Sequence, residues 1–386
     1  MRNSLTLFCF VLFSVGCVTV SPSEDRTEGP PVPATEKRST PIARTDSRVA
    51  LYVTAKGTEL RKIEPEAKED HDAIFAMANK FFDLNRYEDS RKLYDRIIQK
   101  SPDHPMAPFC YYNLGLINMK TLNWPASSAH FQTAYRTLAK KEDKKDALVL
   151  YLEALKKAAS WETLLSEANT ALNENPYQLD FGDEATQEIS LRSAEAMVMM
   201  GKLEEGRRLA EYWITEIRRG LSREEQMFVP NLALAFYVLG KSQVYEFGSF
   251  KLTDAMETLV RKCQKIIDAQ NQFLKAINVG VIFWTNAAAF EIAKLYMDLY
   301  TEMDAQPVPQ ELSDEEKHVY ECEVWNKIAN LLKKSRKTLT KSIDAAKRIN
   351  EDNEYTAMSF SMVADIDRIY DAKESGCADI QGNRSR

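Results

Sequence analysis

Few residues of this 386-residue chain have the types and spacing that catalysis or metal binding requires. The nearest approach to a metal site is His318 with Cys322, which a helix would place on one face beside Glu315. A structural zinc ion is usually closed by four ligands, so these residues predict no metal site. The sequence also lacks the GxSxG, P-loop, GxGxxG and HExxH motifs. We therefore expect no metal, no cofactor and no enzymatic activity.

The clearest chemistry belongs to Cys17, which follows a short apolar segment. Arg2 precedes an apolar run from Leu5 to Val15 that is too short to span a hydrocarbon core of ~30 Å. Its length and flanks are typical of a signal peptide, residues 1–16, so we expect an exported protein. Loss of Arg2 changes the formal charge from −6 to −7. A mildly acidic chain with mixed charges has no basic footprint for nucleic acid or anionic lipid, so we expect no nucleic-acid binding.

The end of this segment resembles the lipobox of bacterial prolipoproteins, in which a small residue precedes a cysteine that becomes lipidated. Val15, Gly16 and Cys17 match the pattern, whereas Ser14 stands where that family usually has an aliphatic residue. The resemblance implies lipidation of Cys17 and a lipid-anchored position at the periplasmic face of the outer membrane, which Val18 favours over the inner membrane. The alternative is ordinary cleavage that leaves Cys17 unmodified.

Residues 17–66 are expected to form a linker, because they are polar and rich in proline. Such a segment cannot bury enough apolar surface to offset its ordering entropy. Roughly fifty residues of this kind give a root-mean-square reach of roughly 40 Å. Arg48 to Thr54 is an apolar interruption. We expect it to dock on the protein's own body, with a partner-binding motif as the alternative.

From His71 onward, apolar residues recur at intervals of three and four, which predicts helices joined by short turns. The large aromatic residues Tyr87, Trp124 and Trp161 are separated by 37 and 37 residues. Small residues are expected to let paired helices approach closely, namely Ala78, Ser90, Gly115, Ser127 and Ala134. A drifted fourth unit is expected around residues 193–213. Single hairpins cannot bury their apolar faces alone, so we expect them to stack.

This pattern resembles the tetratricopeptide repeat, above all in the segments 85–90 and 113–115. The period is 37 residues here rather than the 34 of that family. The resemblance implies an all-α fold over residues 67–220, a right-handed superhelix of stacked antiparallel helix pairs. It also implies a function in protein binding. The competing explanation is a generic helical bundle with accidental periodicity.

Residues 221–374 are expected to be helical, with degenerate repeats as one explanation, and residues 375–386 to be a disordered tail. The stretch from Val279 to Tyr300 is the most apolar, but its polar residues favour a buried core helix over a membrane span. Charged helices are expected over 314–348, and a closing helix over 353–373.

Four cysteines follow the signal region. Cys110 and Cys263 are expected in the core, and Cys377 is expected to be the most exposed. An oxidising compartment would allow a disulfide, but the spacing specifies no pair.

The first helices of tetratricopeptide hairpins line the concave side of the array, so the resemblance implies a partner-binding face there. It places on that face Phe75, Asn79, Phe82, Phe109, Tyr112, Leu116, Met119, Glu153 and Lys156. Four aromatic side chains and a methionine on an open face would form an apolar patch of the kind that binds an extended or helical peptide. Alternatively, the protein's own segments cover these residues.

The leading hypothesis is an adaptor or scaffold lipoprotein of a multi-protein envelope machine, which binds other envelope proteins or peptides. It is similar in this to tetratricopeptide lipoproteins of outer-membrane assembly, gliding motility and secretion. The alternative is a periplasmic small-ligand-binding lipoprotein associated with a transporter, with Trp284 and Tyr296 lining a pocket. Core packing is the competing explanation for those two rings.

Overall fold

The structure is a computed structural model that describes residues 70–173, 182–248, 252, 256–351 and 353–378. These residues form thirteen α-helices and no strand. Consecutive helices pack against each other, which confirms the all-α prediction. Among the described residues there are two compact units, an N-terminal unit up to Leu209 and a C-terminal unit from Ala210.

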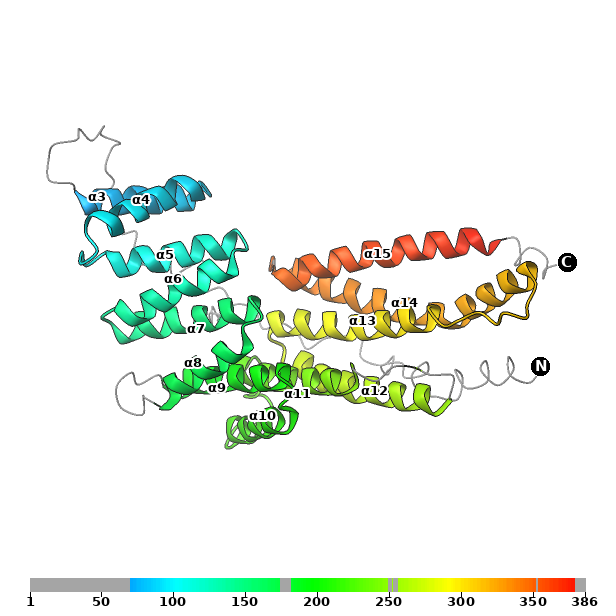
Figure 1. Ribbon diagram of the computed structural model, residues 1–386. Helices are drawn as coiled ribbons and strands as arrows, with labels where there is room; N and C mark the ends of the chain where they lie inside the picture. The colour runs from blue at the N-terminus through cyan, green and yellow to red at the C-terminus, as the bar shows by residue number, and fades with distance from the viewer. Residues whose placement is uncertain (1–69, 174–181, 249–251, 253–255, 352, 379–386) are drawn as a thin grey trace. The chain divides into compact units, whose positions relative to one another are not determined.

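The N-terminal unit is a stack of helical hairpins (Figure 1). Its helices are α3 (His71–Asp83), α4 (Tyr87–Lys100), α5 (Ala107–Lys120), α6 (Trp124–Thr137), α7 (Lys141–Lys157), α8 (Trp161–Asn173) and α9 (Gly182–Met199), followed by α10 (Leu203–Arg218), in which the boundary between the units falls. The second helix of each of the first three hairpins begins at the large aromatic residue that set the predicted period. The aromatic residues therefore mark true structural repeats.

The same turn joins the two helices of all four hairpins. One residue of each turn has a positive φ: Asn85, Leu122, Ala159 and Gly201. The next residue donates its backbone N–H to a carbonyl five residues earlier, for example Arg86 to Phe81 at 2.8 Å and Lys202 to Met197 at 2.8 Å. This is the Schellman geometry, which satisfies carbonyls at a helix end. The turn repeats after 37, 37 and 42 residues, so the drifted fourth unit is confirmed as a hairpin.

Small residues let the paired helices of each hairpin approach closely. The hydroxyl of Ser90 donates to the carbonyl of Ala78 at 2.9 Å, and that of Ser127 donates to the carbonyl of Gly115 at 3.0 Å. A Cβ at Gly115 would lie 2.8 Å from the Phe131 ring, and one at Gly206 would meet Val198. These contacts confirm the packing role predicted for the small residues.

The C-terminal unit is built from longer helices (Figure 1). They are α11 (Pro230–Gly248), α12 (Met256–Val279), α13 (Ile282–Asp304), α14 (Asp314–Arg348) and α15 (Glu354–Gly376). α13 is largely buried and packs against the other four, which confirms the prediction of a core helix. A capping box of Ser313 and Glu316 starts α14, and the Asn353 side chain caps α15. Within the described ranges, none of the helices combines the length and the apolar content that a membrane span requires.

A disulfide joins Cys322 in α14 to Cys377 at the end of α15, with Cα atoms 5.7 Å apart. Cys377 is buried, so its predicted exposure is wrong, because the disulfide draws it onto α14. The predicted start of the disordered tail is also wrong, since α15 continues to Gly376. Cys110 and Cys263 are buried, as predicted, and both are free thiols.

Several predictions fall on residues outside the described ones. They are the signal peptide 1–16, the linker 17–66 with Cys17 and Arg48–Thr54, and the last eight residues of the chain. These stay predictions.

Candidate functional site

The predicted binding residues lie on α3, α5 and α7, the first helices of the first three hairpins. Phe75, Tyr112 and Leu116 are buried. The Phe75 ring lies 5.7 Å from that of Tyr94, and the Tyr112 ring 5.6 Å from that of Phe131. The expectation that these three are exposed is therefore wrong: they fill the space between paired helices. Their role in partner binding stays a prediction.

Asn79 is also buried, within a polar network that joins three helices. Its side-chain oxygen accepts hydrogen bonds from the Tyr94 hydroxyl at 2.5 Å and from the Asn113 amide at 3.2 Å. The same Asn113 amide donates to the Tyr94 hydroxyl at 3.0 Å. A buried polar group is stabilising only when it is hydrogen-bonded, so this network fixes α3, α4 and α5 against each other.

The remaining aromatic and thioether side chains are half-buried. Phe82 and Phe109 pack against the buried residues of both the first and the second hairpin, and Met119 packs against the second. They are the predicted binding residues whose apolar surface stays partly accessible. Substituting them would therefore alter both packing and surface.

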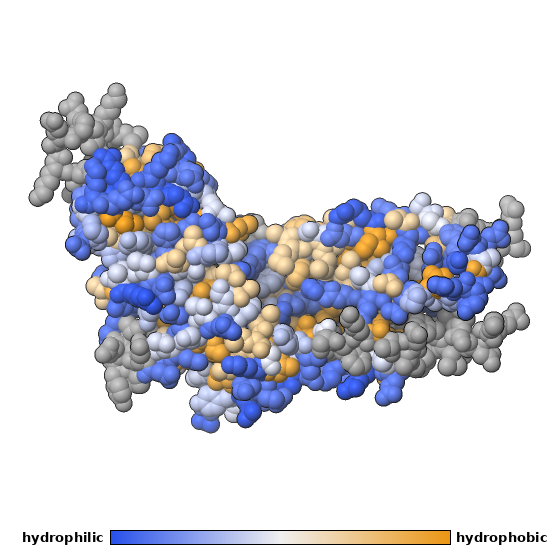
Figure 2. Space-filling view, viewed as in Figure 1, coloured by the Kyte–Doolittle hydropathy of each residue, from blue (hydrophilic) through white to orange (hydrophobic). Residues whose placement is uncertain are grey.

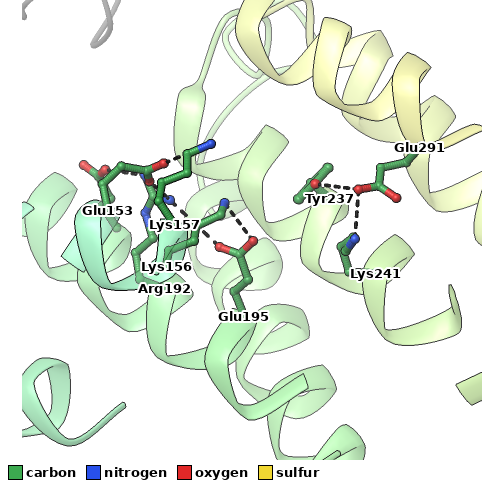
Figure 3. Close-up of polar contacts among 9 residues, drawn as sticks. Glu153, Lys156, Lys157, Arg192, Glu195, Tyr237, Lys241 and Glu291 are labelled. Atoms are coloured by element: carbon green, nitrogen blue, oxygen red, sulfur yellow. Dashed lines mark hydrogen bonds and ion pairs between the residues drawn. The ribbon is translucent and has the colours of Figure 1, made fainter. Parts of the chain in front are cut away.

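Lys156 belongs to a cluster of charged side chains between α7 and α9, which we call the α7–α9 charge cluster (Figure 3). Its Nζ lies 2.8 Å from Glu195 Oε1, and the Arg192 guanidinium lies 2.6 Å from Glu153 Oε2. Lys157 lies 3.9 Å from Glu153, and Arg192 also lies 3.5 Å from Glu188. Three cations thus face three carboxylates.

These charges are partly removed from water, so each depends on its partners. The side chain of Glu195 is 4% exposed, and its Oε2 is buried without a hydrogen bond, 3.9 Å from the Arg192 guanidinium. Burial alone would raise the pKa of Glu153, but Arg192, Lys156 and Lys157 outweigh burial and lower it to about 2. Glu153 is therefore ionised at neutral pH and holds two helices together through Arg192.

Of this cluster, Glu153 and Lys156 were predicted, whereas Arg192 and Glu195 were not. Their spacing on α9 gave a weak signal, because Arg192 reaches Glu188 at i,i+4 and Glu195 at i,i+3. Such spacings usually mark a solvated helix face rather than a buried contact between helices.

The C-terminal unit holds another partly buried ion pair, also drawn in Figure 3. Glu291 accepts from Lys241 at 2.8 Å and from the Tyr237 hydroxyl at 3.1 Å. The rings proposed for a small-ligand pocket belong to the same core: Trp284 lies 5.2 Å from the Tyr237 ring, and Tyr296 donates to Gln270. Both are buried, as core packing predicts.

Metal and thiol chemistry find little support among the described residues. No group of three or more His, Cys, Asp or Glu side chains there could hold a metal ion. Cys322, which the sequence places near His318 and Glu315, forms a disulfide with Cys377. Burial raises the pKa of Cys110 to about 12, which keeps that thiol protonated and unreactive.

No family model matches the chain, and no curated protein matches it either. Solved structures with some similarity include the C-terminal part of a TPR repeat-containing protein from Cytophaga hutchinsonii, at 12% identity, a TM-score of 0.36 and coverage of 78% of this chain and 98% of that one. A tetratricopeptide repeat protein from Parabacteroides merdae has 12% identity and a TM-score of 0.36, with 76% and 98% covered. At this level of similarity, the tetratricopeptide-like character of the chain rests on its own four repeated hairpins.

Proposed function

We propose that this chain is an exported scaffold that binds protein partners through the first helices of its N-terminal unit. The α7–α9 charge cluster is the observation that carries the proposal. Its six ionic groups come from two neighbouring first helices, and they can exchange their present partners for the backbone and charged groups of a bound peptide. The half-buried Phe82, Phe109 and Met119 supply apolar contacts on first helices of the same unit.

In the same proposal, the protein is not an enzyme, and the signal peptide and the lipid on Cys17 place it at the periplasmic face of a bacterial outer membrane. The Cys322–Cys377 disulfide supports this, because such bonds persist in oxidising compartments and are rare in the cytosol. Its partners would be subunits of an envelope machine for outer-membrane assembly, motility or secretion.

The binding proposal is tested by reversing one ion pair without losing it. Lys156→Glu with Glu195→Lys keeps one opposite-charge pair at a distance that is now 2.8 Å, but it also brings like charges towards Arg192 and Glu153. The melting temperature of the double variant is therefore compared with that of the wild-type protein before binding is measured. We expect this double variant to lose envelope proteins that cross-link to the wild-type protein in its native cells. Circular dichroism would check that both proteins are equally helical.

A control is the swap Lys265→Glu with Glu246→Lys in the C-terminal unit, a more exposed pair that lies at 2.9 Å. We expect it to keep every cross-linked partner. Equal capture by both swaps would refute the assignment of the α7–α9 charge cluster to partner binding. The lipid is tested separately, since Cys17→Ala should move the protein from the membrane fraction to the soluble fraction.

A further inference from the structure

The tip of the α5–α6 hairpin carries a residue that neither its turn nor its packing explains. Leu122 has a φ of 58° and is 69% exposed. The equivalent positions of the first, third and fourth hairpins hold Asn85, Ala159 and Gly201, of which the asparagine and the glycine enter this left-handed conformation readily. A bulky leucine in that conformation is uncommon and costs stability. Leu122 therefore exposes apolar surface at a site where a better turn former would fit.

Other side chains at this edge of the N-terminal unit are apolar, aromatic or positively charged. Leu84, at the tip of the adjacent α3–α4 hairpin, is 59% exposed. The hairpins are joined there by a hydrogen bond of 3.1 Å from Arg91 to Asn118. Trp124 begins α6 and is half-buried, and the exposed Lys120 ends α5. Figure 2 shows hydrophobic surface at the turn end of the α5–α6 hairpin.

The charge of this hairpin is one-sided. The sequence has no acidic residue between Asp103 and Glu142, so the α5–α6 hairpin has no carboxylate. Lys120 lies next to the tip, whereas Arg136 lies near the far end of α6 and pairs with Glu167 at 3.6 Å. By comparison, the tip of the α3–α4 hairpin carries charges of both signs. Asp83 precedes Leu84 in the sequence, and Asp89 pairs with Arg86 at 2.6 Å. An anionic surface would therefore meet less repulsion at the second tip than at the first.

We propose that the α5–α6 tip docks into the headgroup region of an anionic lipid bilayer. Leu122 enters the boundary of the acyl chains, Trp124 lies at the level of the headgroups, and Lys120 faces the phosphates. Tryptophan and lysine take these positions at membrane interfaces because each has an apolar body and a polar end. One inserted leucine binds weakly, so the contact orients a protein that is already held near the membrane.

The test is Leu122→Asn in the full chain, compared with its parent. Both proteins carry Cys17→Ala, so that no lipid on that residue carries the binding. Co-sedimentation is measured with vesicles of phosphatidylglycerol and phosphatidylethanolamine, and with vesicles of phosphatidylcholine alone. We expect the parent to prefer the anionic vesicles, and Leu122→Asn to reduce partitioning into them by about tenfold. The melting temperature should not fall, since asparagine tolerates a positive φ.

Two further variants sharpen the result. Tyr212→Gln removes another exposed ring, on α10, and should leave vesicle binding unchanged. Lys120→Gln should weaken binding and reduce its dependence on salt. If Leu122→Asn melts early, Leu122→Gly replaces it, because glycine adopts the same φ without strain.

The proposal is overturned if the parent shows no preference for anionic vesicles, or if Leu122→Asn binds them as its parent does. Loss of a cross-linked protein from Leu122→Asn with vesicle binding intact would make this tip a protein contact instead. Neither result would affect the partner binding assigned to the α7–α9 charge cluster, which the charge swap tests independently.

Discussion

The two units of the chain stabilise helices in different ways. In the N-terminal unit α3 to α9 have 13 to 18 residues, and one turn geometry recurs between paired helices. In the C-terminal unit the helices have 19 to 35 residues, and a disulfide joins the last two. Short hairpins depend on stacked neighbours, whereas long helices bury a continuous core within their own unit. We therefore expect a destabilising substitution to unfold only the neighbouring hairpins in the N-terminal unit, but to affect the shared core in the C-terminal unit.

The largest expected effect comes from removing the aromatic ring that packs over a glycine in each unit. Phe131 lies against Gly115, and Phe273 lies against Gly240. Both are fully buried, so Phe131→Ala and Phe273→Ala should each lower the free energy of unfolding by about 3–5 kcal/mol.

Hydrogen exchange of the backbone amides would show which helices each of the two substitutions destabilises. Phe131→Ala should reduce protection mainly in α5 to α7 and leave the C-terminal unit protected, and Phe273→Ala should expose α11 to α13 together. Equal loss of protection along the whole chain in either variant would contradict the comparison. Ser128→Ala, a change on the exposed side of α6, serves as the control.

The next effect is confined to the C-terminal unit. Replacing Cys322 and Cys377 together by alanine should lower the stability of that unit by about 2–4 kcal/mol, because the unfolded chain is no longer cross-linked. A reducing agent should reproduce the loss in the wild-type protein, since Cys110 and Cys263 are already free. Hydrogen exchange of α14 and α15 would check this, and unchanged protection after reduction would count against a structural role for the bond.

The smallest effect concerns pH and the N-terminal unit. The pKa of Glu153 is about 2 in the folded protein and 4.5 as its ordinary value. Because folding depresses this pKa, its stabilisation is present above pH 5 and is lost as the pH falls towards 2. The shift corresponds to at most about 3 kcal/mol. Glu153→Gln should flatten this part of the pH dependence in denaturant titrations, and an unaltered profile would show that other groups dominate.

Local signals made much of the fold predictable. The 37-residue spacing of Tyr87, Trp124 and Trp161 marks helix starts, and small residues such as Gly115 mark close approach. Both depend on neighbours within one hairpin. The Cys322–Cys377 pair was not predictable, because its partners are 55 residues apart and meet through the packing of α14 against α15.

The binding face was harder to predict for a physical reason. α5 is buried on most of its circumference, by its partner helix and by the neighbouring hairpins, so its apolar residues show no single stripe. The repeat pattern therefore predicts an open face for Phe75 and Tyr112, whereas the structure buries both. The sequence does not predict the buried contacts of Arg192 and Glu195, because charged residues usually mark solvent-facing surface.

The recurrence of one turn has a consequence for how the chain can change in length. Deleting residues 86–122 removes one period and joins Asn85 to Asn123, so a residue with positive φ still precedes an asparagine that caps the next helix. Ser127 would then stand opposite Ala78, where Ser90 stands now. Loss or duplication of such a segment preserves the hairpin register, which gives a gene for this protein a simple way to shorten or extend the array.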